Sequence, residues 1–217
     1  MKNSLGQLDQ LEIQLIHGGY MSNITAKEIA DLRAKTGLPM MEVKGALIEA
    51  DGDEDKAIEI LRKKGLGKAA KKAERVTKSG LIECYSHDGK IGVLVEVLSE
   101  TDFVARNEEF KSFVHDVALH IAAMNPKYVS SDMIPEAEAN KEKELLIEQV
   151  KAEGKPEEIA KKIVEGKMQK YFSDVCLMDQ SFIKDPDKTI GTLRNDLISK
   201  IGENIVISRF VRYELGN

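Results

Sequence analysis

The spacing of apolar residues changes along this chain, and that change limits the folds open to it. Apolar residues recur at helical spacing from residue 24 to residue 78, and they alternate with a period of two from Gly80 to Val97. Helical spacing then returns, and the final run from Ile205 to Leu215 alternates again. Because strands and helices occupy separate stretches, the pattern predicts an α+β fold in which helices pack on a small antiparallel sheet.

The predicted sheet has about three strands. Asp88-Gly89 is a strong hairpin signal because both residue types accept the positive φ of a tight turn. The first strand alternates Ile82, Cys84 and Ser86 against its other face, and the return strand carries Ile91, Val93, Val95 and Val97. The third strand is predicted to pair antiparallel with this hairpin. Its period places the following residues on one face: Ile205, Ile207, Val211, Tyr213 and Leu215.

The helices between the strands complete a predicted α+β core domain at residues 80–217. A long helix carrying Phe110 and Phe113 stops before Pro126. Two charged helices, separated at Gly154-Lys155-Pro156, predict an antiparallel helical hairpin over about residues 135–173. A further helix runs from Thr189 to Ile201.

Residues 21–64 predict a separate three-helix bundle of the ubiquitin-associated type. Thr25 and Glu28 form a capping box, Gly37 ends the first helix and Asp53 can cap the third. So small a bundle stabilises itself only marginally and commonly works as a docking module. Met40 and Met41 stand side by side at the start of its second helix, where consecutive side chains point about 100° apart. Both therefore cannot be central core residues, and one core and one boundary position is the plain interpretation.

The stretch between the two predicted domains, residues 65–79, is rich in lysine and arginine. Gly65 and Gly67 predict a hinge, and an alanine-rich helical pattern follows. The stretch lacks the interleaved aromatic residues that stack on nucleic-acid bases. We therefore expect a solvated linker helix, with contact to phosphates as the alternative.

The first twenty residues do not resemble a signal peptide, because acidic residues interrupt their apolar pattern. A short amphipathic helix ending at Gly18-Gly19 is one interpretation. The other hypothesis is that residues 1–20 are an extension outside the native protein and that Met21 is the true start. Mass spectrometry of the native N-terminus distinguishes the two.

The stretch Ser99-Glu100-Thr101-Asp102-Phe103-Val104-Ala105-Arg106-Asn107 joins the strand hairpin to the long helix. Ser99 and Asp102 have the spacing of a capping box, and Asp102 suits the positive end of a helix dipole. Phe103 lies one heptad before Phe110. It is therefore either the first core residue of that helix or an aromatic ring presented to solvent.

Composition favours a protein-interaction role. The formal net charge of −5 argues against a dedicated nucleic-acid binder, and no apolar run approaches the roughly 20 residues that cross a membrane. Cys84 and Cys176 are too few for a disulfide scaffold and favour a reducing, cytoplasmic setting. The histidines are scattered, and the common phosphate-loop, zinc and nucleophile motifs are missing from the sequence. We therefore expect neither covalent catalysis nor a cofactor.

Two motifs carry a resemblance to a known family. Thr-Asp-Phe-Val-Ala-Arg-Asn-x-x-Phe, after a Val-x-Val-x-x-Glu strand, resembles a signature of bacterial elongation factor Ts. The second motif is Leu32-Arg33-Ala34-Lys35-Thr36-Gly37-Leu38-Pro39-Met40-Met41-Glu42-Val43-Lys44-Gly45-Ala46-Leu47. It resembles the family's Leu-Arg-x-x-Thr-Gly-x-x-Met-Met-x-x-Lys-x-Ala-Leu, and the two motifs stand in the family's order.

The resemblance implies a function. Elongation factor Ts promotes release of GDP from elongation factor Tu, and it does so without binding the nucleotide itself. The implied magnesium-dislodging residues are Thr101, Asp102, Phe103 and Val104, and the implied partner contacts are Met40 and Met41. The chain lacks the length of the family's long members and resembles its short forms, which pair through the core domain, so we hypothesise a homodimer. The alternatives from the residues alone are a ubiquitin-associated-like adaptor and an RNA-binding factor using the basic stretch.

Overall fold

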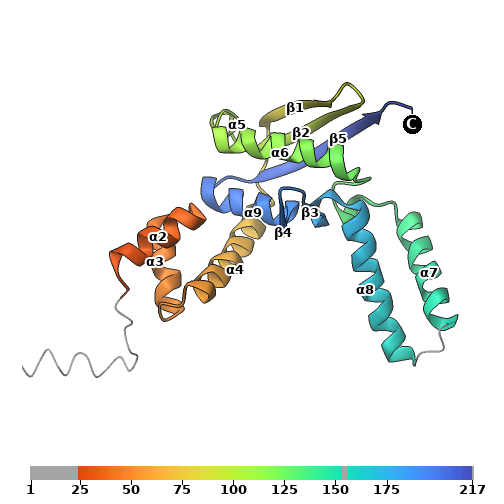
Figure 1. The fold of residues 1–217 in the computed structure, drawn as a ribbon, viewed down its shortest axis with the longest axis horizontal. Coiled ribbons are helices and arrows are strands. Elements are labelled where there is room, and N and C mark those ends of the chain that lie inside the picture. The colour runs from red at the N-terminus through yellow and green to blue at the C-terminus, as the bar shows by residue number, and fades with distance from the viewer. Residues whose placement is uncertain (1–23, 153–155, 217) are drawn as a thin grey trace, which may run out of the picture. The chain divides into compact units, whose positions relative to one another are not determined.

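The computed structural model describes residues 24–152 and 156–216. These divide into two compact units, and the boundary along the chain lies between Lys64 and Gly65. The residues predicted to form an N-terminal extension, 1–20, lie outside this description. The order of helices and strands is shown in Figure 1. Each unit has its own apolar core and is described separately.

The first unit consists of α2 (Ala26–Thr36), α3 (Met40–Glu49) and the first part of α4 (Glu54–Lys72). Thr25 and Glu28 form the predicted capping box, and Gly37 ends α2 in the left-handed conformation at φ 67°. Asp53 accepts a hydrogen bond from the Lys56 N–H at 3.0 Å, as expected of a cap. The buried core of this unit comprises Leu32, Val43, Ala46, Leu47, Ala50, Ala57 and Leu61.

Helix α4 corrects one prediction, because it continues through Gly65 and Gly67 where a hinge was expected. Isolated glycines cost a helix only about 1 kcal/mol each relative to alanine, and the flanking residues are good helix formers. Gly65 also has a packing role within the second unit. A Cβ there would stand 3.0 Å from the Ser199 hydroxyl, so the glycine allows close approach of α4 to α9 (Ile190–Ile201).

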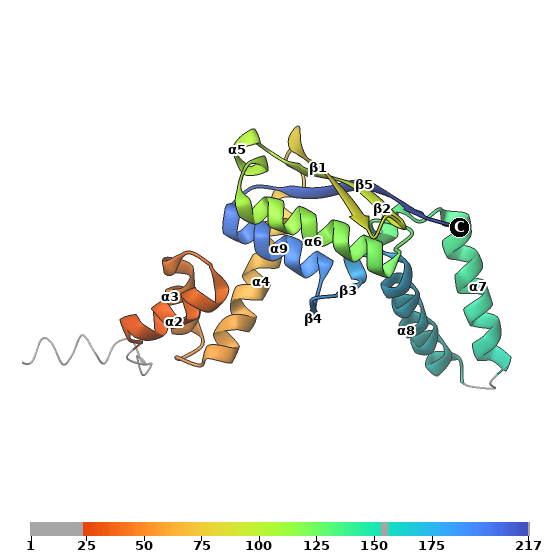
Figure 2. The same ribbon diagram turned by 45° about the horizontal axis from the view of Figure 1, so that its top comes forward.

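The second unit is built on a three-stranded antiparallel sheet in the order β1 (Ser79–His87), β2 (Ile91–Ser99), β5 (Ile205–Glu214). Helices α6 (Glu108–Met124) and α9 lie on the same side of this sheet (Figure 2). Val93, Val95 and Val97 of β2 face the helices and are buried, as their alternation predicted. The α+β class is thus confirmed, with a sheet that one layer of helices covers.

Strand β5 shows a second correction. Ile205 and Ile207 are buried as predicted, but Val211 and Tyr213 are exposed on the opposite face. The register shifts opposite Glu96 and Val97 of β2, so Ser208 is an extra residue in β5. Such a β-bulge reverses which side chains face the core, because the side-chain period of a strand is two. Phe210 consequently packs on the core in place of Val211.

The remaining elements are a helical hairpin and the short segments at its base. Helices α7 (Glu136–Ala152) and α8 (Glu157–Val175) pack together as the predicted hairpin, around Leu146, Val150 and Val164. At the base, the Glu138 carboxylate accepts hydrogen bonds from the Tyr128 and Tyr171 hydroxyls at 2.7 and 3.1 Å. Short elements not predicted from the sequence surround this base: η1 (Ser131–Met133), η2 (Leu177–Asp179), β3 (Ser181–Phe182) and β4 (Asp185–Thr189). No helix among the described residues is both long and apolar enough to cross a membrane.

Candidate functional site

A separate short helix, α5 (Asp102–Ala105), stands between β2 and α6. Its N-cap is Thr101, whose hydroxyl accepts the Val104 N–H at 3.4 Å. The predicted capping box of Ser99 and Asp102 is therefore wrong. Ser99 is fully buried, and its hydroxyl instead donates to the Thr101 carbonyl at 3.0 Å. Helix α6 begins afresh after Asn107, whose side chain accepts the Glu109 and Phe110 N–H groups.

The α5 tip, meaning residues 101–104, presents its aromatic ring to solvent. Phe103 is 84% exposed, the largest exposed fraction among the large apolar side chains of the described residues. Asp102 beside it is also exposed. Phe103 is consequently not the first core residue of the long helix; that position belongs to Phe110, which is fully buried.

Two kinds of contact hold the α5 tip in place. From below, Val104 is only 4% exposed and belongs to the core of the second unit. From the side, Glu203 in the turn between α9 and β5 accepts two hydrogen bonds from Thr101, from the N–H at 3.1 Å and from the hydroxyl at 2.8 Å. The sequence carried no signal for Glu203, because a turn residue that is 102 positions away shows no local pattern.

In the first unit, both methionines of the predicted contact pair are exposed. Met40 is 51% and Met41 is 74% exposed at the start of α3, so neither is the core residue of the plain interpretation. Pro39 precedes them as N-cap and makes no side-chain hydrogen bond to the helix. Ile48, on the same helix, is also about half exposed at 50%. The start of α3 thus offers flexible apolar side chains, which suit a recognition surface.

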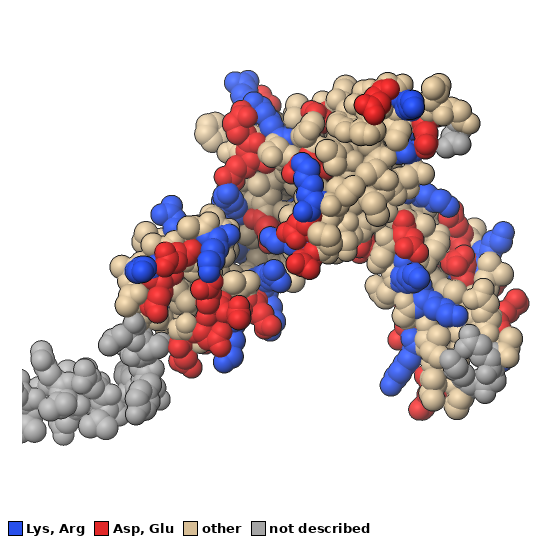
Figure 3. Space-filling view, in the orientation of Figure 1, with Lys and Arg blue, Asp and Glu red and all other residues tan. Residues whose placement is uncertain are grey.

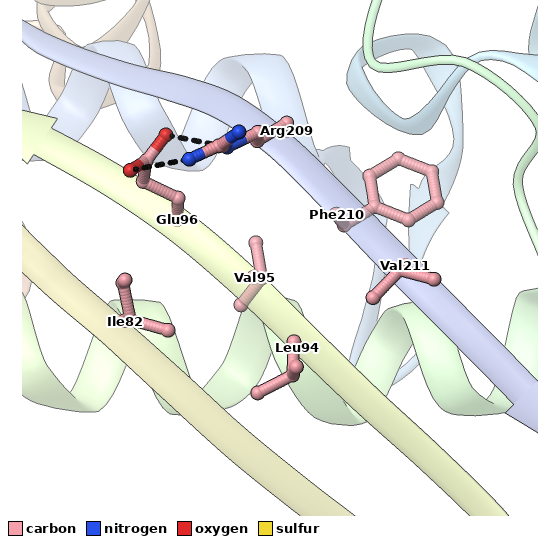
Figure 4. A pocket seen from close by; sticks show the side chains of 7 residues that line it. All are labelled: Ile82, Leu94, Val95, Glu96, Arg209, Phe210 and Val211. Carbon is pink, nitrogen blue, oxygen red and sulfur yellow. Dashed lines mark hydrogen bonds and ion pairs between the residues drawn. The ribbon is translucent and has the colours of Figure 1, made fainter.

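The face of the sheet away from α6 is a third exposed apolar surface. Ile82 of β1, Leu94 of β2 and Val211 of β5 line a shallow pocket there, closed at one end by the Glu96–Arg209 ion pair (Figure 4). Tyr213 extends this open sheet face and is 73% exposed. On the side drawn in Figure 3, acidic and basic side chains are interspersed along α7 and α8.

Two titratable groups away from these surfaces, Cys176 and His120, are fully buried. Cys176 is buried, and burial raises the pKa of its thiol to about 11, which leaves it unreactive at neutral pH. The buried His120 bonds to Gln180 at 3.0 Å, and its Nδ1 accepts the Ile183 N–H at 3.3 Å. Burial lowers the pKa of this histidine. Among the described residues, no three His, Cys, Asp or Glu side chains gather in a way that could hold a metal ion.

Exposed aromatic rings and exposed methionine side chains are typical of surfaces that bind another protein. The chain thus combines an α+β core and a small helical unit with exposed apolar sites of the kind that protein-binding factors carry. Comparison with known proteins gives the family. Residues 25–217 match the profile of the family described as Elongation factor TS.

Curated relatives agree with this match. The chain is 56% identical over 194 residues to Elongation factor Ts of Alkaliphilus oremlandii, covering 89% of this chain and 90% of the relative. It is 55% identical over 194 residues to that of Acetivibrio thermocellus, with 89% and 90% covered. The corresponding identity to the protein of Finegoldia magna is 54% over 204 residues, with 90% and 91% covered. The chain belongs to the elongation factor Ts family.

Proposed function

We propose that this chain is a guanine-nucleotide exchange factor that binds elongation factor Tu in its GDP-bound form and promotes release of GDP, so that GTP can replace it. Membership of the family supports the role, and the exposed ring of Phe103 beside Asp102 is the observation that carries it. In this proposal the chain works in the cytoplasm by protein contact alone. It makes no covalent intermediate and binds no nucleotide, nucleic acid or membrane itself.

The α5 tip acts on the magnesium and phosphate site of the partner. Because the backbone of the tip is already fixed, only the side-chain rotation of Phe103 is lost when its ring inserts between partner helices. Asp102 competes for the polar groups that hold the magnesium shell, and Thr101 and Val104 anchor the tip. Because affinities for the factor and for the nucleotide are reciprocally coupled, the distorted partner that fits the tip binds GDP more weakly. A shift large enough to expel GDP needs several kcal/mol of preference for the distorted state.

Met40 and Met41 contribute docking contacts to the nucleotide-binding domain of the partner. They lie in the other compact unit from the α5 tip. Their role is affinity, because methionine side chains adapt to a surface and do not impose a shape on it.

The test of the tip is Phe103→Ala with elongation factor Tu loaded with a fluorescent GDP analogue. We expect the maximal release rate at saturating factor to fall by about a hundredfold, equivalent to the roughly 3 kcal/mol of a strong interface residue. The factor concentration at half-maximal release should change little, because most of the interface remains. Ile183→Ala, which truncates another exposed apolar side chain, is the matched control. A Phe103→Ala protein that releases GDP at the normal rate would remove the tip from the mechanism.

We also propose that the chain forms a homodimer through the open sheet face, so that two copies of the sheet pack against each other. Ile82, Leu94, Val211 and Tyr213 are exposed there on three neighbouring strands. Exposed apolar side chains gathered on one sheet face are typical of surfaces that another protein covers. Leu94→Glu should give a monomer by light scattering, whereas Leu145→Glu on α7 should leave the dimer intact. A wild-type protein that scatters as a monomer at all accessible concentrations would rule the dimer out.

A further inference from the structure

We infer that Glu203 and Asn204, in the turn between α9 and β5, are positioning residues that set the α5 tip for nucleotide release. This inference rests on the proposed exchange function and adds residues to it that neither motif contains. Its basis is a reciprocal set of hydrogen bonds between two segments about a hundred residues apart. Each segment contributes a glutamate that accepts hydrogen bonds from the other.

We call this reciprocal set of hydrogen bonds the clamp. Its first half joins Glu203 to the tip. One carboxylate oxygen accepts the Thr101 N–H at 3.1 Å and the other accepts the Thr101 hydroxyl at 2.8 Å. Because the single hydroxyl hydrogen is directed to Glu203, the oxygen lone pairs of Thr101 remain to accept the Val104 N–H. Glu203 therefore fixes the orientation in which Thr101 can cap α5.

The second half runs in the opposite direction. The Glu100 carboxylate, just before the tip, accepts the Asn204 N–H at 2.6 Å and lies 3.4 Å from the Arg75 guanidinium. The Asn204 side-chain amide donates to the Ala73 and Arg75 carbonyls at 3.3 and 3.0 Å. Asn204 is 3% exposed, so these bonds are shielded from water. The turn thus ties the approach to the tip to the chain that leaves α4.

The arrangement has a mechanical consequence for Phe103. Helix α5 is a single turn and cannot be stable by its own hydrogen bonds, because nucleation of a helix is unfavourable. An exposed phenylalanine on a loose loop would fold down onto nearby apolar surface rather than stay 84% exposed. With Val104 buried in the core and Glu203 holding Thr101, the backbone that carries Phe103 keeps one orientation before the partner arrives. Preorganisation of this kind lowers the cost of reaching the distorted state.

The experiment is a double-mutant cycle on GDP release from elongation factor Tu. Glu203→Ala should lower the maximal release rate about tenfold, the effect of losing hydrogen bonds to a charged group. The concentration at half-maximal release should stay within about twofold, because Glu203 acts through Phe103 and leaves other contacts in place. Glu203→Ala in a Phe103→Ala background should cause no further loss.

Two controls separate positioning from general damage. Glu109→Ala removes a neighbouring ion pair, with Lys200 at 2.6 Å, that does not touch the tip, and it should leave release unchanged. Glu203→Gln keeps one acceptor and should recover part of the rate. Circular dichroism melting shows whether each variant is folded, and Gln takes the place of Ala in the cycle should the Ala variant unfold.

The outcomes distinguish a failure of this inference from a failure of the proposed exchange function on which it rests. If Phe103→Ala has no effect on release, the proposed function of the tip is wrong. If Phe103→Ala slows release but Glu203→Ala does not, the tip functions without the clamp and the inference is wrong. Additive losses in the double variant would also overturn it, since they would mean that Glu203 contacts the partner independently of Phe103.

Discussion

The α5 tip and the start of α3 both expose large apolar side chains at the beginning of a helix, but they are supported differently. Thr101 at the tip is held by Glu203, from a distant part of the chain, and Val104 is buried in the core. Met40 and Met41 follow Pro39, which makes no capping hydrogen bond through its side chain. One site therefore carries an aromatic ring on a backbone that distant contacts hold, whereas the other carries flexible thioether side chains.

Under the proposed function, this difference assigns the rate of GDP release to one unit and affinity for the partner to the other. A rigid ring can impose a shape on its partner and so change the stability of the bound nucleotide. Flexible methionines can only follow the shape that the partner already has. The expectation is that the tip governs the rate of release and the methionines govern affinity. The following predictions test that division, beginning with the larger effect.

Replacing both methionines, as Met40→Ala with Met41→Ala, should raise the half-maximal concentration for GDP release by about thirtyfold. That corresponds to roughly 2 kcal/mol of lost contact, which is typical of two truncated interface side chains. The maximal rate at saturation should be unchanged. Titration of the release rate with increasing factor measures both quantities in one series.

A matched control for this pair is Ile159→Ala, which truncates an exposed side chain on α8. Should the double methionine variant instead slow release at saturation while binding normally, the division between a rigid and an adaptable site would fail. The same series with Phe103→Ala gives the opposite pattern if the division holds.

Mild acid should lower the free energy of unfolding of the unit that carries the tip, and we expect this effect to be smaller than the two above. The buried His120 has a lowered pKa, caused chiefly by its burial. The unfolded chain then takes up a proton near pH 6.5 while the folded chain does not, so the free energy of unfolding is fully available above pH 6.5 and falls below it. The described residues of the first unit, 24–64, contain no histidine. Denaturant unfolding followed between pH 7.5 and about pH 5.5 measures this slope.

The controls for the acid effect are two histidine variants. His120→Gln should lower stability at every pH and flatten the slope just below pH 6.5. His115→Gln changes a histidine that is exposed and bonded to Glu83, and the slope due to His120 should persist in it. A wild-type slope that His120→Gln leaves unaltered would assign the acid sensitivity to another group.

Much of the fold followed from patterns confined to a few neighbouring residues. Thr25 with Glu28, Gly37, and Asp88-Gly89 each act through hydrogen bonds or dihedral angles within one turn, and the structure has them where they were predicted. The alternation along β2 likewise predicted the buried face correctly, because successive side chains of a strand point to opposite faces. Local physics of this kind can be read without knowing what the segment packs against.

Two of the errors arise where burial or a partner strand overrides a local pattern. The capping box at Ser99 had the right spacing, but the buried Ser99 hydroxyl bonds elsewhere and Thr101 takes the cap. The alternation of β5 was correct until the bulge at Ser208 reversed it, and a bulge is defined by the partner strand. The third error is the hinge expected at Gly65, where the structure has a continuous helix whose glycine allows close approach to Ser199 of α9.

For the candidate site, the sequence by itself determined the residue types: an acid, a ring and a valine in a row, preceded by a strand. It left open whether Phe103 faces the core or the solvent, because one heptad to Phe110 permits either. Only the tertiary structure decided this, since the break between α5 and α6 turns the ring outward. The carboxylate of Glu203, brought beside Thr101 by the return of the chain into β5, then holds the tip in that position.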